Sequence, residues 1–216
     1  MGLVDSETEL TTAATDLLLG AVCVGLAAWL WSAAPVDPWK QGVWVGAFLL
    51  MGGGAGLGAV AHGLRLTATM RAVLWWLIYL SLGLAVSLIA VAAAADGWGE
   101  AAGRTAVPWA LAVGVGLTCA VQWLSGAFFV FAVYQVVVTV VVLGVYASLA
   151  GRALVDGTSS IVVGLVLSLV AAAVQMSRLR LHVVVKLDHN GLFHLVQTLA
   201  VGFIGIGARA GLTLGR

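Results

Sequence analysis

Charged residues are scarce in this chain: Asp, Glu, Lys and Arg make up 9% of its 216 residues, whereas 62% are hydrophobic. Ordinary soluble domains contain about 25% charged and about 45–50% apolar residues, so this composition excludes a soluble fold and indicates an integral membrane protein. The formal net charge is only +1. Because nucleic-acid binding needs a concentrated positive surface, we expect no nucleic-acid partner.

Cysteine is also scarce, and basic residues are absent from the first twelve positions. Cys23 and Cys119 each lie inside an apolar run, where helix packing is the ordinary role of a thiol, so they do not report the redox compartment. The N-terminal segment carries Asp5, Glu7 and Glu9. This is the opposite of the basic start of a secretory signal, so we expect the first apolar run to be retained as a membrane span.

Seven apolar runs approach the length of about 20 residues that crosses about 30 Å of hydrocarbon. Each is predicted as a helix, because backbone groups in lipid must bond within their segment and no barrel-like alternation is present. We therefore predict an all-α, polytopic membrane protein: one seven-transmembrane-helix bundle over residues 1–216, with residues 1–12 as a short polar segment. The expected spans are residues 13–33, 43–64, 70–94, 105–123, 126–149, 159–175 and 191–207.

The seven spans place the N-terminus and the connections 65–71, 122–126 and 178–188 on one side of the membrane, here called the near face. The C-terminus lies on the far face. Basic residues divide evenly between the two faces, so the positive-inside rule gives no orientation. We expect a protein of the plasma (cytoplasmic) membrane, surrounded by membrane lipids. An interfacial belt of tryptophans is predicted near the far face: Trp29, Trp31, Trp39, Trp44, Trp98 and Trp109.

The second span is rich in glycine, at Gly52, Gly53, Gly54, Gly56 and Gly58. A phosphate-binding loop would need a preceding strand and an aqueous edge, and neither is predicted here. Small residues four apart are typical of close helix packing in membranes. We expect such packing either within the chain or between subunits of a homo-oligomer.

Polar residues gather at the start of the last span, where Asp188, His189, Asn190, His194 and Gln197 precede or interrupt an apolar run. Ionisable groups at the edge of hydrocarbon are costly, which makes them candidates for a functional site. Asn190, His194 and Gln197 share one helix face. His189 and His194 differ by about 140° on an ideal helix, so both can bind one ion only if His189 precedes the regular helix, with Asp188 or Asn190 as its N-cap.

His62 ends the second span on the same near face. Three neutral imidazoles, from His62, His189 and His194, can bind zinc and leave a fourth position for water. The alternative is that each interfacial histidine is simply hydrogen-bonded. Four glutamines, at positions 122, 135, 175 and 197, are explained by interhelical hydrogen bonds, and they could also line a polar cavity.

Glu9, Thr12 and Asp16 recur at helical spacing and form a polar stripe on the first span. Helix capping by Thr11 or Thr12, with acidic groups at the positive helix end, is one explanation. The other is catalytic: Asp16, Asp188 or Glu9 would accept a proton from metal-bound water. On that hypothesis Asn190 and Gln197 support the site, and Arg65 and Arg71 meet an anionic head group.

The motif Asn190-Gly191-Leu192-Phe193-His194 resembles the last span of a seven-helix superfamily that includes alkaline ceramidases, adiponectin-type receptors and hemolysin III proteins. That span opens with two histidines four residues apart. Here Asn190 stands at the first position and His189 one residue earlier. In the first span the receptor-like branch has Glu, Asn and Thr-His, and Glu9, Thr12, Thr15 and Asp16 stand at the same offsets.

In the second span of that superfamily a serine precedes a zinc-binding histidine, and His62 resembles this ligand. Gly58 stands where the serine is expected, and the acidic residue of the third span has no counterpart in residues 71–76. The resemblance implies a seven-helix fold and a three-histidine zinc site. The missing serine and aspartate leave the superfamily's amide hydrolysis without two of its groups.

Three functions are compatible with these residues. The first is an integral membrane metalloprotein, a zinc-dependent hydrolase that acts on a lipid amide or ester. The second is a non-enzymatic transporter or proton-coupled carrier, in which Asp16, His62, His194 and the glutamines form a relay. The third is a receptor-like protein whose polar cluster is a hydrogen-bonded lock between the first, second and last spans.

Overall fold

A computed structural model describes residues 2–123, 127–182 and 184–213 of the chain. In these ranges it contains seven helices and a short hairpin, and every helix is long and apolar enough to cross a membrane. The prediction of an all-α seven-helix bundle is confirmed, and the chain is an integral membrane protein. The elements are α1 Glu7–Trp31, α2 Pro38–Gly63, α3 Ala68–Trp98, α4 Glu100–Trp123, α5 Ala127–Gly151, α6 Thr158–Gln175, β1 Arg180–His182, β2 Lys186–Asp188 and α7 His189–Thr213.

Capping residues extend the helices beyond the apolar runs. The first helix begins six residues before the expected span, because the Ser6 hydroxyl accepts from the Glu9 N–H at 3.4 Å and acidic residues occupy the first turn. Capping by Thr11 or Thr12 is therefore wrong. In α2 the Asp37 carboxylate accepts from the Lys40 N–H at 2.9 Å, with Pro38 at the first helical position. The predicted turn at 124–126 lies outside the described residues.

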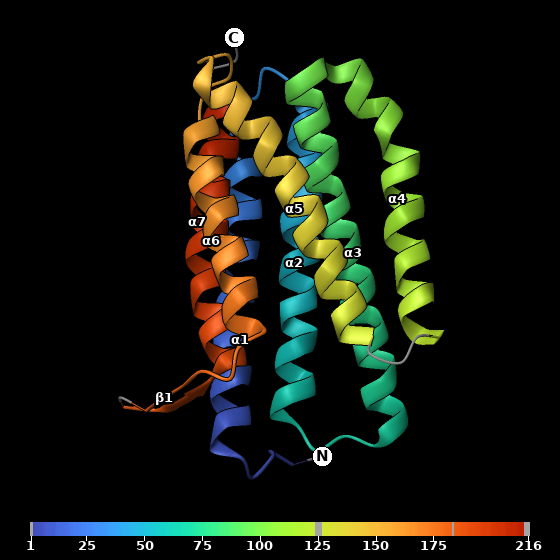
Figure 1. Ribbon diagram of the computed structural model, residues 1–216, viewed down its shortest axis with the longest axis vertical. Helices are drawn as coiled ribbons and strands as arrows, with labels where there is room; N and C mark the ends of the chain where they lie inside the picture. The colour runs from blue at the N-terminus through green and yellow to red at the C-terminus, as the bar shows by residue number, and fades with distance from the viewer. Residues whose placement is uncertain (1, 124–126, 183, 214–216) are drawn as a thin grey trace.

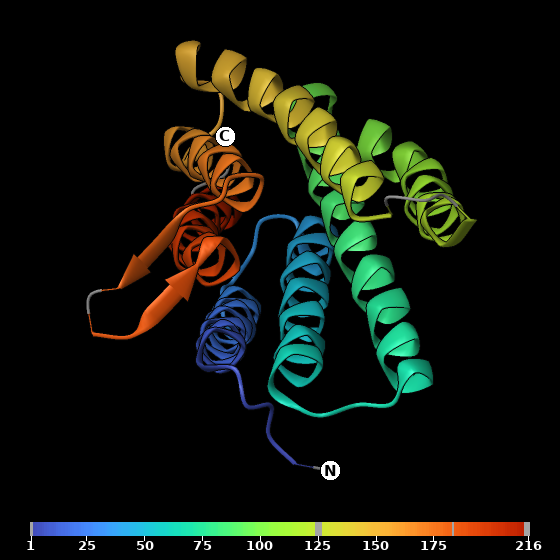
Figure 2. The same cartoon turned by 60° about the horizontal axis from the view of Figure 1, so that its bottom comes forward.

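The helices run alternately up and down, and the two chain ends lie at opposite ends of the bundle (Figure 1). α1 packs between α2 and α7, α6 packs on α7, and α3 packs on α2. α5 crosses the bundle obliquely, contacting α6 and α3, and α4 lies outermost against α3 (Figure 2). α4 and α5 bury little of their surface within the chain, as expected of helices that face lipid.

Of the five α2 glycines between positions 52 and 58, three serve packing within the chain. A Cβ at Gly52 would lie 3.2 Å from the Gly20 carbonyl oxygen of α1, and one at Gly54 would lie 3.0 Å from Leu82 of α3. A Cβ at Gly58 would meet Asp16. Gly53 and Gly56 have no such neighbour within 4 Å. The homo-oligomer through this span stays a prediction.

Of the six tryptophans in the predicted belt, four are exposed, Trp39 is half-buried and Trp44 is buried. Trp29, Trp31, Trp98 and Trp109 are exposed, as an interfacial belt requires. Trp44 is 1% exposed and packs against Phe48 in the core, so the prediction is wrong for this residue. It belongs to the main buried cluster, together with residues of α1 and α3.

Candidate functional site: a polar-ended cavity within the bundle

A cavity of about 650 Å³ lies inside the bundle, lined by every helix except α4. On α3 its lining runs from Trp75 to Ile89, and on α5 from Phe128 to Val142. Each stretch covers fifteen residues, and the fourteen steps between its ends span about 20 Å at the helical rise of 1.5 Å per residue. The cavity is therefore elongated along the bundle axis and extends from the near face toward the middle of the membrane.

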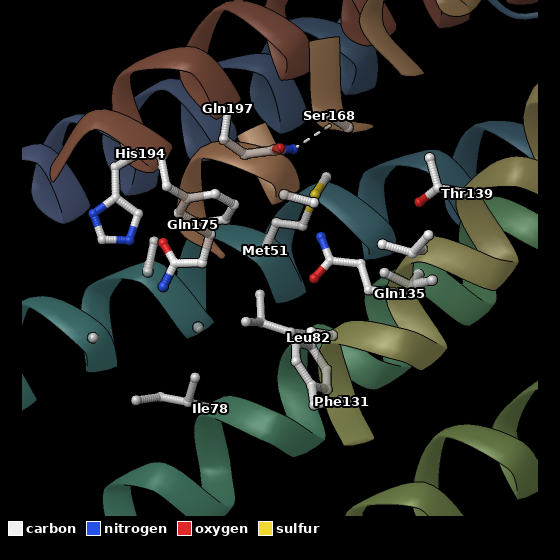
Figure 3. A pocket seen from close by; sticks show the side chains of 18 of the residues that line it. Met51, Ile78, Leu82, Phe131, Gln135, Thr139, Ser168, Gln175, His194 and Gln197 are labelled. Atoms are coloured by element: carbon white, nitrogen blue, oxygen red, sulfur yellow. Dashed lines mark hydrogen bonds between the residues drawn. The ribbon is translucent and has the colours of Figure 1, made fainter. Parts of the chain in front are cut away.

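The polar lining residues concentrate toward the near face, and most of the remaining wall is aliphatic or aromatic. Figure 3 shows His194, Gln175 and Gln197 on one side of the cavity and Gln135 and Thr139, from α5, on the other. Among the described residues no lysine or arginine lines the cavity. Its polar lining residues include Asp16, His62, Gln135, Thr139, Ser168, Gln175, His189, Asn190, His194 and Gln197.

Asp16 and His194 form the buried centre of the polar end. The His194 Nε2 lies 3.1 Å from Asp16 Oδ1, with the two side chains 10% and 5% exposed. The other ring nitrogen, Nδ1, lies 3.2 Å from the Thr15 hydroxyl, and that hydroxyl donates to the Thr12 carbonyl oxygen at 2.9 Å. Both ring nitrogens of His194 are therefore engaged by α1.

These contacts are all satisfied when the pair shares one proton. Since the Thr15 hydrogen is directed to the Thr12 carbonyl, the Thr15 oxygen accepts from Nδ1–H of His194. A single proton then lies between His194 Nε2 and Asp16 Oδ1. Whether it sits on oxygen or on nitrogen, the pair as a whole is neutral. A neutral pair can be buried in a membrane domain at far lower cost than a lone charge.

A second carboxylate–histidine pair lies nearer the membrane surface. His62 Nδ1 is 2.8 Å from Glu9 Oε2, and the His62 ring packs edge-on against Trp75, with centroids 5.7 Å apart. Glu9 is 42% exposed and His62 16%. The predicted stripe on α1 therefore meets α2 through Glu9 and α7 through Asp16.

Asp188 and Asn190 organise the start of α7. Asp188 Oδ1 accepts from the N–H groups of Asn190 and Gly191, both at 3.0 Å, which confirms it as the predicted N-cap. The same oxygen accepts from the Thr12 hydroxyl at 3.3 Å. Asn190 accepts from Gln175 of α6 at 2.6 Å. These contacts give Asp188 a structural role at the helix start.

Three residues that line the cavity each have a buried oxygen atom with no hydrogen-bond partner among the described residues. These atoms are Asp16 Oδ2, Gln175 Oε1 and Gln197 Oε1. The other polar atom of each of these side chains has a partner. The Gln197 amide nitrogen, for example, donates to the Ser168 hydroxyl at 3.2 Å (Figure 3). Because buried polar atoms are nearly always paired, these three acceptors call for a partner such as water or a bound molecule. The glutamines line this cavity as predicted, except that the Gln122 side chain lies outside the described part.

The three histidines predicted to bind zinc do not assemble a metal centre. His62, His189 and His194 all line the cavity, yet in the described chain no group of three His, Cys, Asp or Glu side chains is placed to hold a metal ion. The physical reason is that His194 has no free ring nitrogen and His62 directs one of its two toward Glu9. Zinc does not fit this arrangement unless the contact between Asp16 and His194 breaks.

The predicted role of Arg65 and Arg71 at an anionic head group stays a prediction, and the structure places both outside the cavity. Arg65 forms an exposed ion pair with Asp5, and Arg71 donates to the Ala61 carbonyl oxygen at 3.4 Å. Neither lines the cavity. Both serve the connection between α2 and α3.

Sequence reasoning missed the polar network at the far face. Lys40 Nζ lies 2.7 Å from Asp96 Oδ1, and the fully buried Tyr146 hydroxyl donates to Asp96 Oδ2 at 2.9 Å. Lys40 also donates to the Gly211 carbonyl oxygen at 3.4 Å. The network joins α2, α3, α5 and α7 at the end of the bundle opposite the polar cluster. The only signal for this network in the sequence is a lysine near the start of α2 and an aspartate near the end of α3, two helix ends that meet at the far face.

Comparison with known proteins places the chain by family but not by activity. No curated protein and no solved structure matches it. A family model matches residues 11–213, which covers all seven helices apart from the first turn of α1. The chain therefore belongs to this family, DUF6962, which is described as a family of unknown function.

Proposed function

We propose that this protein binds an amphiphilic, lipid-like molecule inside the membrane, with the polar head group at the Asp16 end of the cavity and the apolar tail between α3 and α5. The observation that carries the proposal is a largely apolar cavity with a polar end, where three of the lining residues carry an unpartnered buried oxygen. A head group that donates hydrogen bonds would satisfy them, and satisfying a buried polar group is worth about 1–3 kcal/mol.

The size and the lining of the cavity favour a molecule with one long tail. A volume of about 650 Å³ lies within the range of about 300–1,000 Å³ that is typical of ligand pockets. Its length of about 20 Å suits an extended chain rather than a compact ring system. The deeper wall offers Val142, Leu165 and Ile204, which provide dispersion contacts and no polar partner.

The charge of the lining favours a head group that is neutral or cationic. Its unpartnered atoms are acceptors, Asp16 contributes a carboxyl group, and no described lysine or arginine reaches the cavity. A carboxylate or phosphate head would bring further acceptors and negative charge without a partner, which is costly in a buried site. Hydroxyl, amide N–H and ammonium heads all supply donors. Hydrolysis of a lipid amide or ester stays an expectation of the family resemblance.

Photo-crosslinking in nanodiscs of uncharged phosphatidylcholine tests this proposal. Three probes would carry the same long tail with a diazirine and differ only in the head: an alcohol, an amine or a carboxylate. We expect the alcohol and the amine to label cavity-lining residues of α3 and α5, and the carboxylate to label them weakly.

A matched pair of variants on α5 gives the control. Ala132 lines the cavity, whereas Ala147 on the same helix is exposed and does not. Ala132→Phe should reduce labelling of the cavity, and Ala147→Phe should leave it unchanged. Equal labelling by all three probes, or labelling that survives Ala132→Phe, would contradict the proposal.

A further inference from the structure

The segment between α6 and α7 is an amphipathic β-hairpin rather than the loop expected from the sequence. β1 and β2 pair antiparallel, with Arg180 opposite Asp188, Leu181 opposite Leu187 and His182 opposite Lys186. Directly opposed residues share a face of a β-ribbon, and successive residues alternate between faces. One face therefore carries Arg180, His182, Lys186 and Asp188, and the other carries Leu181 and Leu187.

The hairpin exposes both its apolar and its basic residues. Leu181 is 49% exposed, Val184 is 89% exposed, and Arg178 and Arg180 are exposed as well. An isolated two-stranded hairpin is marginal in water, and exposed apolar clusters usually mark an interaction surface. This surface therefore needs a partner that accepts apolar groups on one side and positive charge on the other.

The position of the hairpin identifies that partner. It projects sideways from the bundle, across the direction of the helix axes, at the near-face level where α6 ends and α7 begins (Figures 1 and 2). The helices span the bilayer, so a ribbon at right angles to them at this level lies along the membrane surface. The lipid leaflet itself offers hydrocarbon below and phosphate groups above.

We propose that this hairpin is an interfacial anchor that binds anionic phospholipids of the near leaflet. Its Leu181 and Leu187 face enters the acyl boundary, and Arg178 and Arg180 meet lipid phosphate oxygens through charge-assisted hydrogen bonds. The inference is independent of the cavity ligand, because neither arginine lines the cavity.

The base of the hairpin is fastened to the helices of the polar cluster. Lys186 Nζ lies 2.6 Å from Glu7 Oε2, and the Thr11 hydroxyl donates to the Lys186 carbonyl oxygen at 2.6 Å. Asp188, at the end of β2, accepts from Thr12. The anchor therefore holds the starts of α1 and α7, the helices that carry Asp16 and His194, at a fixed depth in the membrane.

Spin labels on the two faces of β1 test the anchor in the full chain. Leu181→Cys and His182→Cys are neighbours on opposite faces, and the background would replace both native cysteines by Ala. In nanodiscs that contain phosphatidylglycerol we expect the Leu181 label to be more accessible to oxygen and the His182 label to an aqueous nickel chelate. Equal aqueous accessibility at both positions would overturn the proposal and leave the hairpin as a surface for a soluble partner.

Native mass spectrometry tests the lipid charge. Each interfacial arginine contributes about 1 kcal/mol toward an anionic surface, so Arg178→Gln with Arg180→Gln should weaken retention of phosphatidylglycerol about thirty-fold. The matched control is Arg104→Gln with Arg152→Gln at the far face, which should retain the lipid. Thermal unfolding of both double variants confirms that they are folded. Loss of lipid in neither double variant, or equally in both, would overturn the proposal.

Discussion

A methyl group added at Gly58 would collide with the carboxyl group at the centre of the polar cluster. The new Cβ would lie 2.9 Å from Asp16 Oδ2, 3.0 Å from Oδ1 and 3.1 Å from Cγ. Because these atoms belong to a buried side chain at the junction of α1 and α7, the carboxyl group must move and lengthen its 3.1 Å contact with His194. Gly58→Ala is therefore expected to loosen this junction.

The change in the free energy of unfolding that Gly58→Ala causes follows from two opposing effects. Replacing a helical glycine by alanine stabilises the helix by about 1 kcal/mol, whereas overpacking a buried site costs about 1–3 kcal/mol, and more if a buried hydrogen bond is also lost. Gly53, on the same helix, has no neighbour within 4 Å of its hypothetical Cβ. Gly53→Ala should keep the gain, so we expect Gly58→Ala to be less stable than Gly53→Ala by about 2–3 kcal/mol.

Reversible unfolding in mixed micelles would measure these free energies of unfolding. A double-mutant cycle separates the collision from other effects, because removing the carboxyl group in Asp16→Ala should relieve it. In the Asp16→Ala background, Gly58→Ala and Gly53→Ala should then have similar effects. Equal effects of the two glycine substitutions in the parent protein would refute the placement of Asp16 against α2.

Three further results are expected. Elemental analysis of the purified protein should find zinc well below one equivalent, since both ring nitrogens of His194 are engaged. If the protein instead contains stoichiometric zinc that is lost in both His62→Ala and His194→Ala, the hydrolase hypothesis is restored. Asp96→Ala should lower the free energy of unfolding by about 3–5 kcal/mol because it leaves a buried lysine without its partner. Glu100→Ala, in an exposed pair, should lower it by at most about 0.5 kcal/mol. Equal losses in the two variants would contradict the buried network. The free energy of unfolding of Asp16→Asn should stay within about 1 kcal/mol of the parent value, because the new amide can donate to His194 Nε2. A loss of stability as large as that in Asp16→Leu would show that the pair needs its proton.

The sequence was sufficient for the fold because hydropathy and length alone define membrane spans. It also located the polar cluster, since Glu9, Asp16, His62 and His194 are conspicuous in an apolar chain. What it left open was the pairing within the cluster. Together with His189 these groups can form a three-histidine metal site, and without it they can form two carboxylate–histidine pairs. The structure has the second arrangement because Asp16 lies on α1 at the level of His194 and Gly58 leaves room for its carboxyl group.

Other features were missed because each depends on distant residues. Lys40 and Asp96 are separated by 56 positions, and each alone reads as an ordinary charge at a helix end. Trp44 resembles a belt residue in its position, and only the packing of α2 against its neighbours shows that it is buried. The hairpin was overlooked because its strands have only three residues each, too few for a visible alternation.

The two ends of the bundle bear on the choice between a binding protein and a transporter. A transporter needs a route to both faces, and the cavity lining reaches Val142 on α5. One helical turn beyond it, Tyr146 is fully buried and bonded to Asp96, which is paired with Lys40. Opening this end would separate a buried ion pair and expose a core tyrosine, at a cost of several kcal/mol. On the proposed function, a molecule held in the cavity would therefore enter and leave at the near face or between helices, as in a receptor-like binding protein rather than a transporter.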